Sequence, residues 1–376
     1  MSETEKIQII DNSRKNKIKQ RSGLGKLSIN LCLFAILFGI FITALFMGRY
    51  PIDPISVVII LIAGIMERIG STIASITGVK VAFFWSVQHT WPNVMNTVIW
   101  DVRLPRAIAV ILAGSSLAVS GATYQGVFRN PLVSESILGV SAGAGVGAAL
   151  AILMDQSTAV IELMAFVFGL LAVSMTFGIS HVYRSNPTLV LVLAGIIVGG
   201  LFSAIISLIK FIADPYSKLP DIVFWLMGSF AKVSVNTVVF IAPVIVISML
   251  TIVLLRWRLN VLSMGDEEAK SLGIDTKRFR PIVIVCATLL TAAAVCIGGV
   301  IGWVGLVIPH ISRMIVGPDH KDTIIASILI GGAYLLAVDT ICRTLTSVEI
   351  PISIVTSLFG APIFLYLLYK SKKTWS

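Results

Sequence analysis

Four charged residues stand inside or at the edges of strongly apolar segments. Asp339 and Arg343 are four residues apart, so they share one face of any helix that contains them. Charge inside a membrane segment is costly and usually paired, which favours a structural ion pair over a contact with a transported molecule. Arg103 and Arg106 flank Pro105, and each offers a planar guanidinium that suits carboxylates. Snorkelling of both side chains to a membrane surface is the equal alternative.

The other reactive side chains do not form a catalytic or metal-binding pattern. No two of the 4 histidines have the spacing of metal ligands. The cysteines all fall inside apolar runs without a C-x-x-C pair, and we expect them to pack as small hydrophobic residues: Cys32, Cys286, Cys296 and Cys342. No Ser/Lys or His/Glu/Asp constellation indicates a membrane enzyme. The sequence therefore predicts neither a metal site nor an enzymatic activity.

The composition indicates a protein that lies in lipid. Of 376 residues, 56% are hydrophobic and 13% are charged, whereas soluble domains carry roughly 25% charged residues. The formal net charge is +10, but the basic residues lie at the chain ends and between apolar runs. Because they form no basic stripe, nucleic-acid binding is excluded as an explanation.

Ten apolar segments are candidates for membrane-spanning helices, since a helix needs about 20 such residues to cross the hydrocarbon core. The predicted spans are 28–48, 105–126, 137–154, 160–182, 188–210, 235–255, 281–298, 304–316, 323–343 and 352–369. The eighth is short. The sequence thus predicts an all-α, polytopic membrane domain over 28–369, with tails at 1–27 and 370–376.

The segment 54–70 is the ambiguous one. Its apolar run from Ile55 to Met66 ends at Glu67 and Arg68, which is short for a span. We interpret it as an amphipathic helix within an outer loop, 51–104.

The distribution of basic residues supports ten spans. With both termini in the cytoplasm, most of the 29 Lys and Arg residues fall on the inner side, as the positive-inside rule requires. An eleventh span at 54–70 would place the basic segment 256–280 outside. We therefore predict a protein of the cytoplasmic membrane with both termini on its inner face.

Small residues recur at every fourth position in three of the predicted spans. Such ladders let helix backbones approach closely where no hydrophobic effect drives association. They are Gly114, Ala118 and Ala122; Gly139, Gly143 and Gly147; and Gly195 and Gly199. The ladders predict a compact bundle.

The inner loop 256–280 is longer than the others and reads RWRLNVLSMGDEEAKSLGIDTKRFR. Glu267 to Lys270 favour a short helix, and Gly273 is a stop signal. A short helix between two spans is a suitable docking element for a soluble partner. A solvated connector is the other interpretation.

Several segments resemble the FecCD-type family of ABC importer permeases, which serve iron-siderophore, haem and cobalamin transport. The similar pieces occur in the family's order between residues 100 and 369. They read RLPRAIAVILAGSSLAVSGATYQGVFRNPL (103–132), ILGVSAGAGVGAAL (137–150), FWLMGSF (224–230), LSMGDEEAKSLGID (262–275), GWVGLVIPHISRMIVGPDHK (302–321), AVDTICR (337–343) and EIPISIVTSLFGAPIFLYLL (349–368). The family usually has an acid and then Pro shortly after NPL, where this chain has Ser134 and Glu135.

The resemblance implies a type II ABC importer permease that works as a homodimer. It implies two ABC ATPase subunits on the inner side and an extracytoplasmic substrate-binding protein on the outer side. The chain contains no G-x-x-x-x-G-K-[ST] pattern, so ATP-Mg is expected on the partner ATPase, and no cofactor is expected on this chain. The loop expected to contact the ATPase includes Leu262, Ser263, Gly265, Glu268, Ala269, Leu272 and Gly273.

The resemblance also implies roles on the outer side. Residues matching Arg103, Arg106 and Arg343 receive acidic groups of the binding protein in the family. Trp225, Met227 and Gly228 match a short outer helix that borders the entrance to the pathway, where a gate and simple wall packing are equal alternatives.

The expected function is import of an iron chelate such as a ferric siderophore, powered by ATP hydrolysed in a separate subunit. Cobalamin or haem is the alternative cargo. A secondary transporter driven by an ion gradient is the alternative class. Such transporters usually carry midplane carboxylates and paired repeats, and this chain offers little beyond Asp339.

Overall fold

The computed structural model describes residues 23–77, 91–182 and 187–375. Within these ranges every regular element is helical. The elements are α2 (Gly23–Phe46), α3 (Pro54–Thr77), α4 (Asn93–Thr97), η2 (Val98–Arg103), α5 (Leu104–Phe128), α6 (Val140–Leu153), α7 (Thr158–Val182), α8 (Pro187–Ile212), α9 (Lys218–Leu226), α10 (Val235–Met264), α11 (Asp266–Ser271), α12 (Thr276–Gly298), α13 (Val304–Val316), α14 (His320–Thr344) and α15 (Ile352–Trp375).

Each predicted span corresponds to one helix. Eight described helices are long and apolar enough to cross a membrane, and α6, α13 and the apolar part of α15 are shorter apolar helices. Without α3 these are the ten predicted spans, so the all-α polytopic fold is confirmed. The predicted tail 1–27 lies mostly outside the described residues, and α15 continues through most of 370–376.

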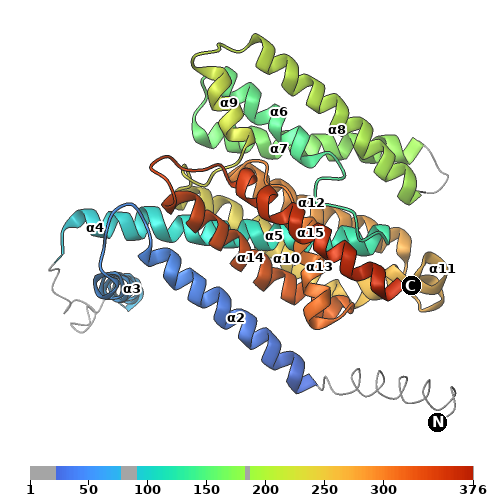
Figure 1. Cartoon of the computed structure of the whole chain (residues 1–376), viewed down its shortest axis with the longest axis horizontal. Helices are drawn as coiled ribbons and strands as arrows, with labels where there is room; N and C mark the ends of the chain where they lie inside the picture. The colour runs from blue at the N-terminus through green and yellow to red at the C-terminus, as the bar shows by residue number, and fades with distance from the viewer. Residues whose placement is uncertain (1–22, 78–90, 183–186, 376) are drawn as a thin grey trace.

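The helix α3 is longer than the sequence indicated. It continues seven residues past Gly70 to Thr77, and by length and composition it could cross a membrane. Its direction differs from that of the bundle: α3 is seen end-on in Figure 1 while α2 and α5 run across the view. The helix α3 is therefore not aligned with the other long helices, and its place in an outer loop stays a prediction.

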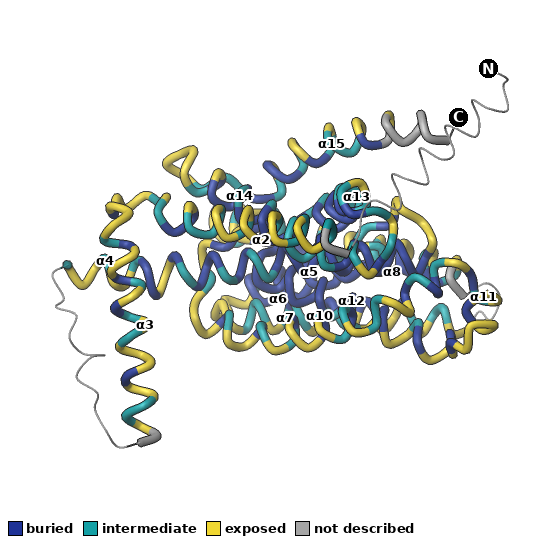
Figure 2. Tube along the Cα trace, turned by 90° about the horizontal axis from the view of Figure 1, so that it is seen from below, coloured by how far each residue is buried: buried dark blue, intermediate teal, exposed yellow. Residues whose placement is uncertain are grey.

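The centre of the bundle is α5, which packs against α10, α12, α13 and α14. Figure 2 shows the tube dark blue through this centre and mostly yellow along α3. Two glycines of α5 bring neighbouring backbones into contact. A Cβ on Gly114 would lie 2.3 Å from the Gly331 carbonyl oxygen, and a Cβ on Gly121 would lie 1.9 Å from that of Gly305. Close packing of small residues therefore holds this core together.

The helices α6, α7 and α8 form a second packed group, joined to the first mainly through α12 (Figure 1). The predicted small-residue ladders lie at its contacts. A Cβ on Gly147 would lie 2.2 Å from the Met164 carbonyl oxygen, and one on Gly195 would lie 2.2 Å from that of Ile137. These helices approach closely because no side chain separates their backbones.

The bundle has two functional ends. At one end α2 finishes and α5 begins, close to α3; we call this the α3 end. At the other end α10 finishes and α12 begins, with α11 between them; we call this the α11 end. The two ends lie on opposite sides of the molecule, and α15 runs toward the α11 end (Figure 1).

Candidate functional site

A cavity of about 590 Å³ opens at the α3 end of the bundle. Its size is within the range of sites that hold drug-sized molecules, roughly 300–1,000 Å³. Its wall combines aromatic, aliphatic and charged side chains from five connections and the helices beside them. The residues are Arg49, Ile152, Asp155, Gln156, Thr158, Ile161, Glu162, Lys218, Asp221, Phe224, Trp225, Gly228, Ser229, Ala231, Lys232, Ile297, Gly299, Val348, Glu349, Ile350 and Pro351.

The short helix α9 forms one side of this cavity, and its place on the outer side of the membrane stays a prediction. The turn before it is closed by Asp214, whose Oδ1 accepts from the backbone amides of Tyr216 and Ser217 at 2.9 Å each. These hydrogen bonds lower the pKa of Asp214. Lys218 pairs with Asp155 on the α6–α7 connection, so α9 is tied to the opposite wall.

Backbone hydrogen bonds fix the segment that follows α9. Gly228 has a left-handed backbone, with φ of +77°, which favours glycine. Its carbonyl accepts from the Ile352 amide at 3.0 Å, and the Met227 carbonyl accepts from the Ser353 amide at 3.1 Å. Trp225 and Gly228 line the cavity, whereas the structure places Met227 beside the start of α15. A gating role for these three residues stays a prediction.

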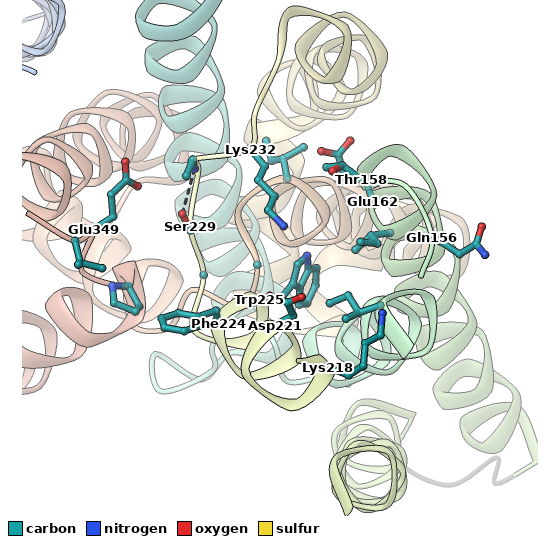
Figure 3. Close-up of a pocket in the computed structure, with 18 of the residues that line it drawn as sticks. Gln156, Thr158, Glu162, Lys218, Asp221, Phe224, Trp225, Ser229, Lys232 and Glu349 are labelled. Atoms are coloured by element: carbon teal, nitrogen blue, oxygen red, sulfur yellow. Dashed lines mark hydrogen bonds between the residues drawn. The ribbon is translucent and has the colours of Figure 1, made fainter. Parts of the chain in front are cut away.

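The charges around the cavity are mixed (Figure 3). Figure 3 shows lysines and carboxylates around the same cavity, and Lys232 extends toward the Trp225 side chain. The charged lining residues are Arg49, Lys218 and Lys232, against Asp155, Glu162, Asp221 and Glu349. The wall therefore does not present a single sign of charge to a ligand.

A buried ionic cluster lies beside this cavity. The Arg106 Nη2 atom is 2.8 Å from Asp339 Oδ1, and Arg106 Nη1 is 2.9 Å from Glu349 Oε1. Arg106 and Asp339 are 9% and 1% exposed. The expected Asp339–Arg343 pair is looser, at 3.6 Å. The principal partner of Asp339 is thus Arg106, from a helix distant in sequence, and the predicted Asp339–Arg343 pair is present as the weaker contact.

Arg103 and Arg343 bind the end of α2. Arg103 donates to the carbonyls of Leu45 at 2.7 Å and of Phe46 at 3.1 Å. Arg343 donates to the carbonyls of Met47, at 2.6 Å, and of Ala44. The last carbonyls of a helix lack partners within the helix and carry partial negative charge, so arginine is favourable there. In the structure, Arg103 and Arg343 therefore bind the C-terminal end of α2 to the bundle. Their predicted role in binding acidic residues of a partner protein stays a prediction.

The sequence reasoning missed Arg49. This exposed residue lies on the α2–α3 connection and lines both the large cavity and a smaller one of about 210 Å³ that contains Arg103, Arg106 and Arg343. Its only signal in the sequence is its position directly after the first span. Of the four arginines that line the smaller cavity, Arg49 is the exposed one, whereas Arg103 and Arg106 are buried and Arg343 is partly buried.

At the opposite end, the predicted helix in the loop 256–280 is present as α11. Gly265 and Gly273 flank it with φ of +146° and +78°. Ala269 is fully buried, while Glu268 is exposed.

The other residues predicted to contact the ATPase are also partly buried and partly exposed. Leu262 is buried in the core and Leu272 is 58% exposed, and Ser263 bonds back to the Asn260 carbonyl. The α11 segment thus presents one face to the bundle and one to the outside.

Glu135, on the connection between α5 and α6, is a second residue whose environment the sequence did not reveal. It is 2% exposed, and a Cβ on Gly305 would lie 2.2 Å from its Oε2 atom. Among the described residues, Oε2 has no hydrogen-bond partner. Burial raises the pKa of Glu135 to about 7, although the amides of Glu135 and Gly305 act in the opposite direction.

Comparison with known proteins agrees with this arrangement. The model of the FecCD transport family matches residues 36–370. The molybdate import system permease protein MolB of Haemophilus influenzae is 43% identical over 74% of this chain and 83% of that protein. A Helicobacter pylori protein, assigned as an iron chelatin transport system permease, is 38% identical over 74% of this chain and 84% of that protein.

A solved structure shares the fold. It is described as an inward-facing conformation of a proposed metal-chelate type ABC transporter, is 38% identical, and matches with a TM-score of 0.77 over 91% of this chain and 99% of that one. The family match covers most of the chain and includes both ends of the bundle. The chain is therefore a multi-pass membrane permease of the FecCD transport family, that is, an ABC importer permease.

Proposed function

We propose that this permease imports a metal chelate across the cytoplasmic membrane, and that the chelate is an iron compound such as a ferric siderophore. The cavity at the α3 end carries this proposal. Its volume of about 590 Å³ suits a chelate, and Phe224 and Trp225 give it an apolar wall for an organic ligand shell. Haem and corrinoids are the alternative cargoes, because they too are metal chelates that need a cavity of this size with an apolar wall.

Molybdate is the second candidate cargo, because the MolB relative is 43% identical. A small oxyanion would leave most of the cavity empty. The wall sets four carboxylates, Asp155, Glu162, Asp221 and Glu349, against three basic side chains, so it offers a dianion no net positive surface. The geometry of the cavity therefore favours the chelate.

The energy for import comes from a separate ABC ATPase in this proposal. Two ATPase subunits dock on the α11 segments of a permease homodimer, and the chain itself performs no hydrolysis. The division of α11 into a buried face with Ala269 and an exposed face with Glu268 supports a docking role. This assignment places the α11 end and the C-terminus in the cytoplasm, together with the N-terminus.

A substrate-binding protein delivers the cargo at the α3 end. Arg49 is accessible there, with Arg103, Arg106 and Arg343 behind it. Carboxylates of the delivery protein would meet the fork of Arg49 first. Trp225, Met227 and Gly228 would then border the entrance as an outer gate. Movement between outward and inward openings requires different contacts in the two states, which the ATPase supplies.

Uptake by the assembled complex tests the cargo. The permease, its ATPase and its binding protein are reconstituted in liposomes with ATP inside, and ⁵⁵Fe-labelled ferric siderophore or ⁹⁹Mo-labelled molybdate is offered outside with the binding protein. The proposal predicts accumulation of the iron chelate and no competition by excess molybdate. Accumulation of molybdate alone would replace the iron assignment and leave the permease assignment intact.

A further inference from the structure

The turn between α13 and α14 is held by one side chain of α10. Asn260 Nδ2 donates to Asp319 Oδ1 at 2.6 Å, and Asn260 Oδ1 accepts from the His320 backbone amide at 2.7 Å. Both polar atoms of the amide are used, so the contact fixes the distance and the orientation of the turn relative to α10.

Hydrogen bonds join the turn to the start of α14. Asp319 caps that helix by accepting from the Lys321 amide at 2.8 Å, and its carbonyl accepts from the Thr323 amide at 2.9 Å. Burial acts to raise the pKa of Asp319, but the hydrogen bonds of Asn260 and of the Lys321 amide outweigh it and lower the pKa. The carboxylate that Asn260 holds is therefore charged.

Asn260 also lies near the end of the helix that leads into the docking segment α11. The helix α10 continues without interruption to Met264 and leads through Gly265 into α11. At 1.5 Å per residue, Asn260 lies roughly 7 Å along the axis from Gly265. Arg280 of α12 pairs with Asp266 at the start of α11. A displacement of α11 that carries the end of α10 with it would therefore reach Asn260.

From the turn, contacts continue into the bundle. The His320 side chain is buried between α10 and α5, and a Cβ on Gly126 would lie 2.9 Å from its Cε1 atom. On α13, Arg313 Nη2 donates to Gln125 Oε1 at 2.5 Å. The end of α5 is thus in contact with both the start of α14, through His320, and α13, through Arg313.

The other end of α13 leads to the cavity. The connection before α13 begins at Gly299, where a Cβ would lie 2.4 Å from the carbonyl oxygen of Trp225. The carbonyl of Gly298, the last residue of α12, accepts from the Ser229 amide at 3.0 Å. The short helix α13 therefore extends between the turn that Asn260 holds and the wall of the large cavity.

We infer that Asn260 is a positioning residue that makes the α13–α14 turn follow α10 and α11, so that ATPase-driven movement of α11 shifts α13 and the cavity wall. This inference rests on the proposed function, because it assigns the ATPase to α11. Its direct consequence is that loss of the amide separates ATP hydrolysis from transport.

The test uses the full permease–ATPase complex with the binding protein in liposomes and measures ATP hydrolysis and uptake separately. Asn260→Ala removes both hydrogen bonds. The matched control Asn236→Ala removes an exposed side chain at the opposite end of α10. We expect Asn260→Ala to keep ATP hydrolysis within about twofold of wild type while uptake per ATP falls at least fivefold, and Asn236→Ala to change neither.

Rescue distinguishes positioning from general damage. Asn260→Asp places two carboxylates together and should lose uptake, whereas Asn260→Asp with Asp319→Asn restores a donor and an acceptor and should recover it. Normal uptake per ATP in Asn260→Ala would overturn the inference. Loss of ATPase co-purification in Asn260→Ala, without recovery in the double variant, would also overturn it and leave only a folding role.

A third readout does not depend on transport. Addition of nucleotide to the complex should change the hydrogen exchange of residues 317–322 in wild type but not in Asn260→Ala. An equal change in both would contradict the inference. Failure of the proposed function has a different signature, because the wild-type complex itself would then import nothing with ATP.

Discussion

Arg106 of α5 and Asp339 of α14 form a buried ion pair in which two guanidinium nitrogens face one carboxylate, with Nε at 3.1 Å from Oδ2 and Nη2 at 2.8 Å from Oδ1. The pair joins the central helix of the bundle to α14 at the α3 end. Glu349 shares the same guanidinium from a more exposed position, with 26% of its side chain accessible. Loss of the Asp339 carboxylate should therefore lower the stability of the fold more than loss of the Glu349 carboxylate.

Asp339→Asn should destabilise the permease more than Glu349→Gln. Removal of one partner of a buried pair leaves an uncompensated charge and costs about 3 kcal/mol, whereas a half-exposed partner contributes about 1 kcal/mol or less. Thermal unfolding of the purified variants in detergent measures the order. If Glu349→Gln unfolded at the lower temperature, the assignment of Asp339 as the principal partner would be wrong.

Gly121→Ala should disrupt the core, because its Cβ would lie 1.9 Å from the Gly305 carbonyl oxygen and neither backbone can give way easily. Overpacking of this kind costs roughly 1–3 kcal/mol or more. The matched control is Gly178→Ala on α7, where a Cβ meets nothing within 4 Å. We expect the control to be neutral or slightly stabilising. Equal unfolding temperatures for both variants would contradict the close approach of α5 and α13.

Glu135→Gln should remove the loss of folding stability that ionisation of the buried Glu135 carboxyl causes at high pH. The pKa of Glu135 is raised to about 7 by burial, so the protonated form is favoured in the folded state. Stability linked to this group is present at acidic pH and is lost as the pH rises through about 7. The variant should therefore unfold at a higher temperature than wild type at pH 8, by an amount on the order of 3 kcal/mol in free energy.

The comparison at pH 5 is the control for Glu135. There the folded carboxyl is neutral, and because pH 5 lies only slightly above the ordinary glutamate pKa of 4.5, most of the difference in unfolding temperature seen at pH 8 should be gone. A constant difference between pH 5 and pH 8, or a gap that widens toward acid, would show that Glu135 is ionised in the folded protein.

Both ends of α3 should face the same side of the membrane. In a variant without native cysteines, Asp53→Cys and Ser75→Cys should both react with an impermeant maleimide added to intact cells. Ser271→Cys in α11 should react only after the membrane is opened. Reaction of Asp53→Cys but not of Ser75→Cys would mean that α3 crosses the membrane, and the topology of every later loop would change.

The spans and the family were predictable because they depend on local properties. Hydropathy and length locate a membrane helix without knowledge of its neighbours, and the ladders with Gly114, Gly147 and Gly195 correctly indicated close backbone contacts. The helix α11 was predictable from Glu267 to Lys270 and the glycine stop. The length of α3 was not predictable. In the sequence, the charged pair Glu67 and Arg68 resembles the end of a helix, and only the structure shows that Arg68 packs on Trp100.

The pairing of charges was not predictable in the same way. Spacing alone joins Asp339 to Arg343, four residues away, whereas the better partner Arg106 is 233 residues away along the chain. Arg68 likewise lies over the Trp100 ring, 3.8 Å from its centroid. Such contacts depend on which helices become neighbours, and a single sequence does not contain that information.

Glu135 and Asn260 illustrate a second limit. Each is a polar residue near the end of a predicted span, where exposure to water is the ordinary expectation. Glu135 is instead buried against Gly305 because the α5–α6 connection folds back onto the bundle. Asn260 meets the α13–α14 turn because α10 is nine residues longer than its predicted span.

The most direct test of the central claim is the energy source of transport. Proteoliposomes that contain the permease and its ATPase are supplied with binding protein and labelled ferric siderophore, either with ATP inside and no ion gradient, or with a proton or sodium gradient and no ATP. The account predicts accumulation with ATP alone and none with the gradient alone. Accumulation driven by the gradient without the ATPase would contradict it, and the docking role of α11 would be lost as well.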